Sequence, residues 1–156
     1  MKIGLILILV PFLLGLIISQ AVSDNISFEM PFSDSKEKIS PHDRIDESQI
    51  FVYNDMVVLQ MKGASLAEYA DTNSMDPLLD EGSNGIEIAP KDENDLHVGD
   101  IIAYETSIGL IVHRIVGIGD DEEGKYFILK GDNNMENDPY RIRFDQIRYV
   151  LVGIIY

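Results

Sequence analysis

The chain contains no cysteine and no tryptophan, and only three of its 156 residues are histidine. The absence of cysteine excludes disulfide bonds, thiolate catalysis and cysteine-based zinc sites. The three histidines, His42, His97 and His113, lack the HxH or HxxxH spacing that is typical of metal ligands. We therefore expect neither a metal ion nor an organic cofactor.

Basic residues are also scarce. Lysine and arginine together number 12 against 27 aspartates and glutamates, which gives a formal net charge of −15. Binding to a phosphate backbone requires clustered lysine or arginine, so nucleic acid is excluded as an expected partner. The length allows one modest domain with tails and leaves no room for a second hydrophobic core.

The N-terminal segment is the one long hydrophobic run. Residues 3–18 are almost wholly apolar, and a helix of this length spans about 24 Å against a hydrocarbon core of about 30 Å. Small residues follow in Ser19-Gln20-Ala21, at the spacing of a leader cleavage site. Residues 1–21 are therefore predicted to form a hydrophobic helix that is either a signal anchor or a removable signal peptide. In both cases the bulk of the chain lies outside the cytoplasm.

The remaining sequence divides into a polar linker, residues 22–48, and a β-rich domain, residues 49–156. The linker is rich in serine and aspartate and has no sustained hydrophobic period. The domain consists of short apolar runs separated by turn signals, a pattern that favours an all-β, mostly antiparallel fold over βαβ units. The predicted strands cover residues 50–53, 56–61, 86–89, 101–105, 110–118, 126–130 and 147–156, and residues 66–69 fit either a strand or a helical turn.

Three segments of this domain carry residues suited to nucleophilic catalysis. They are Thr72-Asn73-Ser74-Met75-Asp76-Pro77, then Val112-His113-Arg114, and then Gly131-Asp132-Asn133-Asn134 with Asp138 a little further on. A serine hydroxyl is a poor nucleophile alone, so it needs a base within hydrogen-bond reach and donors aimed at the oxyanion. Each segment is unremarkable alone, because Asp-Pro and Gly-Asp are ordinary turn sequences and a histidine in an apolar strand is commonly a core residue.

In this order and spacing, the three segments resemble the type I signal peptidase family. The closer resemblance is to its archaeal and endoplasmic-reticulum branch, in which histidine replaces the lysine of the bacterial enzymes. The resemblance covers residues 50–156 and implies a coiled, barrel-like arrangement of antiparallel sheets. It also implies a serine endopeptidase, membrane-associated with a single N-terminal span, whose catalytic domain is extracytoplasmic. Its expected partners are exported preproteins and membrane lipid.

The resemblance also assigns roles to residues. Ser74 is the expected nucleophile, and Thr72 with the Ser74 N–H forms the expected oxyanion hole. His113 is the expected general base, since a neutral imidazole is available at neutral pH. Both Asp132 and Asp138 are candidates for the carboxylate that orients the imidazole, and we favour Asp138.

Several alternatives remain open from the sequence. Lys130 is a rival base, because related enzymes use a serine and lysine dyad, but it lies outside the strand that carries His113. Arg114 faces the opposite side of that strand and is expected to be structural. The chain also fits a non-catalytic homologue that binds peptides at a surface, or a protease that processes only itself at Ser19-Gln20-Ala21.

Overall fold

The computed structural model describes residues 37–156, which belong almost entirely to one contact unit, Lys38–Tyr156. This part of the chain is mainly β, with three short 3-10 helices as its only helical elements. No helix within it has the length and hydrophobicity needed to cross a membrane. The predicted hydrophobic helix at residues 1–21 lies outside the described residues.

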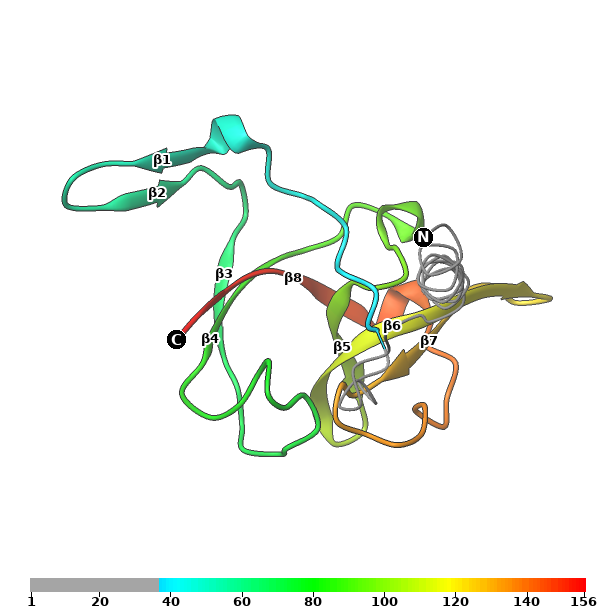
Figure 1. Cartoon of the computed structure of the whole chain (residues 1–156). Helices are drawn as coiled ribbons and strands as arrows, with labels where there is room; N and C mark the ends of the chain where they lie inside the picture. The colour runs from blue at the N-terminus through cyan, green and yellow to red at the C-terminus, as the bar shows by residue number, and fades with distance from the viewer. Residues whose placement is uncertain (1–36) are drawn as a thin grey trace, which may run out of the picture. The chain divides into compact units, whose positions relative to one another are not determined.

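Eight strands form two antiparallel sheets (Figure 1). β1 and β2 make a separate hairpin, and the other six strands pair in the order β3-β4-β8-β5-β6-β7. The prediction of a mainly antiparallel β fold is confirmed. The strands are β1 (Ile50–Val52), β2 (Val57–Leu59), β3 (Ser65–Glu68), β4 (Asn84–Ile88), β5 (Ile101–Thr106), β6 (Gly109–Asp121), β7 (Gly124–Lys130) and β8 (Ile147–Ile155).

The six-stranded sheet does not close into a barrel within residues 37–156. β3 pairs only with β4 and β7 only with β6, so the barrel-like part of the expectation is not met. The free edge of β7 is lined instead by the chain that follows it. Asp138 N–H donates to the Leu129 carbonyl at 2.8 Å, and Phe127 and Ile142 exchange two backbone hydrogen bonds at 2.8 and 3.0 Å. This return path brings Asp138 back beside the sheet.

The central strand β5 is buried on both faces. Ile101 packs with one cluster of buried side chains, which includes Met75 and Leu79 of the loop before β4. Ile102 packs with the other, larger cluster, which includes Tyr104 and residues of β6, β7 and β8. Since successive side chains of a strand point to opposite faces, β5 anchors both clusters.

The segment before the first strand also contacts the domain. Arg44 places one guanidinium nitrogen 2.6 Å from the fully buried carboxylate of Asp100, and His42 N–H donates to the same carboxylate at 2.8 Å. Residues 38–46, which fall within the predicted linker of residues 22–48, are therefore held against the sheet by a buried ion pair.

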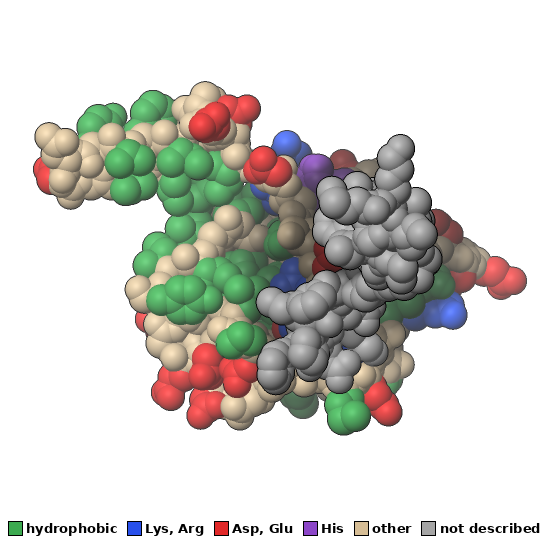
Figure 2. All heavy atoms as spheres, in the orientation of Figure 1, with side chains coloured by type: hydrophobic (Ala, Val, Ile, Leu, Met, Phe, Trp, Pro, Cys, Tyr) green, Lys and Arg blue, Asp and Glu red, His purple; other side chains and the backbone are tan. Residues whose placement is uncertain are grey.

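The β1–β2 hairpin exposes apolar side chains along its length. Figure 2 shows hydrophobic side chains gathered on it. An isolated two-stranded hairpin has too little buried surface to form a core, so its side chains remain in contact with solvent. The exposed apolar residues are Ile50, Phe51, Val52, Tyr53, Met56, Val57 and Val58.

Strand β4 carries a buried carboxyl. Glu87 is only 4% exposed, and the Tyr69 hydroxyl donates to its Oε1 at 3.2 Å. Gly85 makes room for this contact, because a Cβ at that position would lie 1.8 Å from the Tyr69 hydroxyl oxygen. Burial raises the pKa of Glu87, and the hydrogen bond from Tyr69 offsets only part of that effect.

We predict that Glu87→Gln stabilises the protein more at alkaline than at acidic pH. A carboxyl whose pKa is higher in the folded than in the unfolded chain lowers stability as the pH rises between the two values, and the amide removes this loss. Thermal unfolding at pH 4 and pH 8 measures the effect. The gain in Tm should be larger at pH 8, and the exposed control Glu122→Gln should show no such difference. An equal gain at both pH values would contradict the prediction.

Candidate active site

Ser74 lies at the start of a turn whose buried side chains pack against the sheet. Its neighbour Met75 and the nearby Leu79 are 3% and 4% exposed and pack against Ile101. The Leu78 and Leu79 N–H groups both donate to the Met75 carbonyl, at 3.0 and 3.1 Å. The buried side chains fix the turn, while Ser74 itself remains partly accessible at the rim.

The backbone before Ser74 takes an unusual conformation. Asn73 has a φ of 57°, in the left-handed region that asparagine tolerates better than most residues. This local reversal precedes the serine directly, so the choice of asparagine at position 73 helps set the direction of the Ser74 side chain.

A second loop braces the Ser74 backbone. Asn133 N–H donates to the Ser74 carbonyl at 2.9 Å, and the Asn133 side-chain amide donates to the Asn73 carbonyl at 2.9 Å. Gly131 makes this approach possible, since a Cβ there would lie 2.6 Å from the Ser74 carbonyl oxygen. Two segments that are 57 or more residues apart in the sequence are thereby clamped together.

His113 lies on β6 and is 7% exposed. Its Nδ1 is 2.9 Å from Asp138 Oδ1 and 2.7 Å from Oδ2. A carboxylate on Nδ1 favours the tautomer that carries its proton there, which leaves Nε2 unprotonated as a potential base. The same carboxylate accepts a hydrogen bond from the Tyr104 hydroxyl at 2.8 Å.

The electrostatics of Asp138 reflect these contacts. Burial alone would raise the pKa of this carboxyl, but hydrogen bonds from His113 and Tyr104 and the positive charge of a protonated His113 outweigh it. The pKa of Asp138 consequently lies below its ordinary value, and the group is a carboxylate at neutral pH.

Asp132 faces a different partner. The Arg114 guanidinium donates to both of its oxygens, from Nε at 2.8 Å and from Nη2 at 2.6 Å. Arg114 Nη1 also donates to the Gly99 and Ile39 carbonyls at 2.9 and 3.2 Å. The structure thus brings Asp138 onto His113, while Asp132 forms a buried ion pair on the other face of β6.

One cavity of about 370 Å³ brings the nucleophile and base candidates together. Ser74, Thr72 and His113 line it along with apolar residues such as Leu79 and Leu110. Thr72 Oγ1 is 3.1 Å from Ser74 Oγ. Within residues 37–156 the Ser74 hydroxyl makes no hydrogen bond to the imidazole, and the Ser74 N–H donates to no acceptor.

Lys130 does not line this cavity. Its ammonium group donates to the Met135 carbonyl at 3.0 Å, close to the surface. The structure therefore gives the rival base no contact with the Ser74 hydroxyl.

Tyr104 is the site residue that the sequence interpretation did not identify. In the β5–β6 hairpin Ile102 pairs with His113 and Tyr104 with Ile111. Paired residues of antiparallel strands lie on the same face, so Tyr104 and His113 are diagonal neighbours on one face of the sheet. The sequence predicts two strands joined by a short turn, which suggests a hairpin. Placing Tyr104 beside His113, however, requires the pairing register of that hairpin.

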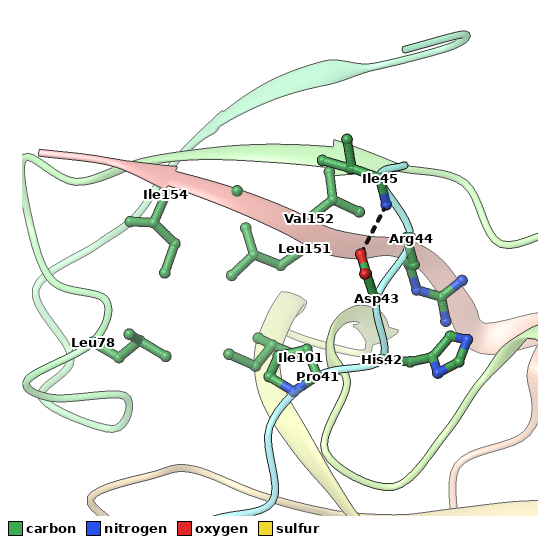
Figure 3. Close-up of a pocket in the computed structure, with 11 residues that line it drawn as sticks. Pro41, His42, Asp43, Arg44, Ile45, Leu78, Ile101, Leu151, Val152 and Ile154 are labelled. Carbon is green, nitrogen blue, oxygen red and sulfur yellow. Dashed lines mark hydrogen bonds between the residues drawn. The ribbon is translucent and has the colours of Figure 1, made fainter. Parts of the chain in front are cut away.

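Two other cavities lie nearby. One of about 420 Å³ shares His113 with the first and is also lined by Tyr104, Asp138 and Tyr140. The other, of about 340 Å³, is drawn in Figure 3, where Leu78, Ile101, Leu151 and Ile154 surround it beside the segment from Pro41 to Ile45. It contains none of the predicted site residues. Within residues 37–156 no group of three or more histidine, aspartate or glutamate side chains is arranged to hold a metal ion.

Comparisons with protein-family models, with curated proteins and with solved structures gave no match to this chain.

We predict that Asp132→Ala lowers the free energy of unfolding by about 3–5 kcal/mol, because it leaves the buried Arg114 guanidinium without its anion. The two side chains are only 5% and 8% exposed. Urea denaturation measures the loss, with Asp145→Ala as an exposed control that changes stability little. A loss in Asp132→Ala no larger than in the control would contradict a structural role for this ion pair.

Proposed function

We propose that the chain is a membrane-associated serine endopeptidase that removes leader peptides from exported proteins. The supporting observation is that Ser74 and His113 line one cavity while the Asp138 carboxylate is hydrogen-bonded to Nδ1 of the imidazole. A serine, histidine and aspartate mechanism requires such a carboxylate on Nδ1, together with a serine that can reach Nε2 from the same cavity. The resemblance of the three motifs to type I signal peptidases supports the choice of substrate and the association with membrane lipid.

In the proposed mechanism Ser74 Oγ attacks the scissile carbonyl as His113 Nε2 takes its proton. Asp138 keeps the imidazole oriented and stabilises its protonated form. His113 then gives the proton to the leaving amine, and a water molecule repeats the sequence to release the acyl group. The developing oxyanion accepts hydrogen bonds from the Ser74 N–H and from the Thr72 hydroxyl, which is already 3.1 Å from Ser74 Oγ.

The hydrogen bond between Ser74 and the imidazole forms, in this mechanism, when substrate binds. Catalytic hydrogen bonds are often long or misaligned in an empty site and tighten in the complex. In this mechanism the Ser74 side chain rotates from Thr72 toward His113 while Asn133 holds the Ser74 backbone in place.

The cavity also supports the proposed substrate. Its walls include Ala70, Leu79, Ile108 and Leu110 beside Ser74. An extended peptide with small apolar side chains near the cut fits such a wall, with its backbone hydrogen-bonded to a strand edge. A signal anchor at residues 1–21 would hold the enzyme beside substrates that are themselves in the membrane.

The decisive experiment incubates the purified full-length protein with a preprotein that carries a leader peptide. We predict that Ser74→Ala and His113→Ala each reduce the rate of cleavage by about 10⁴-fold or more, as expected for members of a catalytic unit. Lys130→Ala should retain activity, since its ammonium group points to Met135. Gel analysis and mass spectrometry of the products give the rate and the site of cleavage.

Three outcomes would redirect the proposal. Equal cleavage by Ser74→Ala and the parent chain would exclude Ser74 as nucleophile. Binding of the leader without cleavage in either would favour a peptide-binding surface protein. Cleavage of the chain's own N-terminus alone, seen as a mass shift that Ser74→Ala abolishes, would favour self-processing.

A further prediction concerns the oxyanion hole. Thr72→Val keeps the shape of the side chain but removes the hydroxyl, and we expect kcat to fall by about 10²- to 10³-fold, as for loss of one oxyanion donor. Thr72→Ser restores a donor and should retain most of the activity. The steady-state parameters of the two variants check this, and equal kcat in Thr72→Val and Thr72→Ser would remove Thr72 from the mechanism.

A further inference from the structure

The Tyr104 hydroxyl is a buried polar group that the proposed mechanism does not use. The residue is 3% exposed and belongs to the larger hydrophobic cluster, together with Ile102, Ile115 and Phe127. Its hydroxyl donates to Asp138 Oδ2 at 2.8 Å. A buried hydroxyl costs free energy unless it is hydrogen-bonded, so this contact holds Tyr104 and Asp138 in a fixed relation.

Two donors from two neighbouring strands thus meet on one carboxylate. His113 Nδ1 on β6 is 2.7 Å from Oδ2, the oxygen that also accepts from Tyr104 on β5. Among residues 37–156 the backbone of Asp138 makes one hydrogen bond to the sheet, from its own N–H to the Leu129 carbonyl. The rotation of the carboxylate is therefore set by Tyr104 and His113 together.

We propose that Tyr104 is a positioning residue of the active site, which acts through Asp138 to hold His113 in the tautomer with its proton on Nδ1. The proposal rests on the proposed function. Without the phenol, the Asp138 carboxylate is held by His113 alone, one side-chain donor within residues 37–156 instead of two. The acceptor on Nδ1, which favours an unprotonated Nε2, is then held less firmly.

The surroundings of the imidazole leave few other groups for this role. Asp138 is its one charged contact within residues 37–156, and Arg114, the next residue along the strand, is paired with Asp132 on the opposite face. Burial, and the hydrogen bond to Asp138, raise the pKa of Tyr104, so the phenol stays a donor throughout the neutral range. Its effect on Asp138 is consequently constant over the pH range of an assay.

The test combines kinetics with NMR on Tyr104→Phe, which keeps the ring and removes only the hydroxyl. We expect kcat to fall by about 10- to 100-fold, the range found when an outer hydrogen-bond partner of a metal-bound histidine is removed. KM should be unchanged, because Tyr104 does not line the cavity that contains Ser74. In ¹⁵N-labelled protein, the Nδ1 proton of His113, assigned by its loss in His113→Ala, should exchange with water faster than in the parent chain, because its acceptor is held less firmly.

Tyr149→Phe is the matched control. Tyr149 lies on β8 opposite Ala103 and makes no side-chain hydrogen bond within residues 37–156, so its variant should match the parent in every measurement. A double-mutant cycle guards against a general loss of structure. If Tyr104 acts through Asp138, the effect of Tyr104→Phe on proton exchange disappears in an Asp138→Ala background.

The outcomes separate this inference from the function on which it rests. Unchanged Nδ1 exchange in Tyr104→Phe, or an equal effect of Tyr104→Phe with and without Asp138, would overturn the positioning role. The NMR measurement needs no substrate. It therefore tests the role of Tyr104 even if the Ser74→Ala experiment shows that the chain is not an endopeptidase. Faster exchange that depends on Asp138, together with a lower kcat at constant KM, would support the proposal.

Discussion

The arrangement of the candidate site depends on one buried cation. The Arg114 guanidinium donates to both oxygens of Asp132 and to the carbonyls of Gly99 and Ile39, so it joins β6 to three other segments. A buried guanidinium is tolerated only when its donors are paired in this way. The loop that begins at Gly131 is held against the sheet as a result, and that loop in turn clamps the Ser74 backbone. A residue with no part in the chemistry thereby fixes where the nucleophile candidate lies.

The alternation of a single strand links the two halves of the site. His113 and Arg114 are consecutive on β6, and successive side chains of a strand point to opposite faces. One face therefore carries the imidazole with Asp138 and Tyr104, while the other carries the ion pair that secures the Ser74 loop. A shift of this strand by one residue would exchange the two faces and separate both groups from their partners. The pairing of β6 with β5 is consequently a requirement of the site as well as of the fold.

Much of the fold could be predicted from the sequence, and part of the site could not. The strands were recognisable because their apolar runs are short and the turns between them are marked by glycine, asparagine and aspartate. The separate environments of Asp132 and Asp138 were not recognisable, because both follow β7 in a polar loop with the same turn residues. Only the return of the chain along β7, through the hydrogen bond from Asp138 N–H to Leu129, decides which carboxylate reaches the imidazole. Tyr104 was missed for a similar reason, since its neighbourhood depends on the pairing register of two strands.

The distribution of rigidity in the site suits the proposed chemistry. The backbone of Ser74 is fixed by Asn133, and the imidazole is fixed by Asp138 and Tyr104, so the serine side chain is the part left to move. Rotation about one side-chain bond crosses between staggered positions at a small cost compared with moving a loop. If the chain is the endopeptidase proposed above, its resting state keeps the Ser74 hydroxyl on Thr72 and away from the base. A substrate carbonyl that accepts a hydrogen bond from the Thr72 hydroxyl would compete with Ser74 for that hydroxyl and release the serine side chain toward His113. Activation of the serine would then depend on a substrate carbonyl in the oxyanion hole.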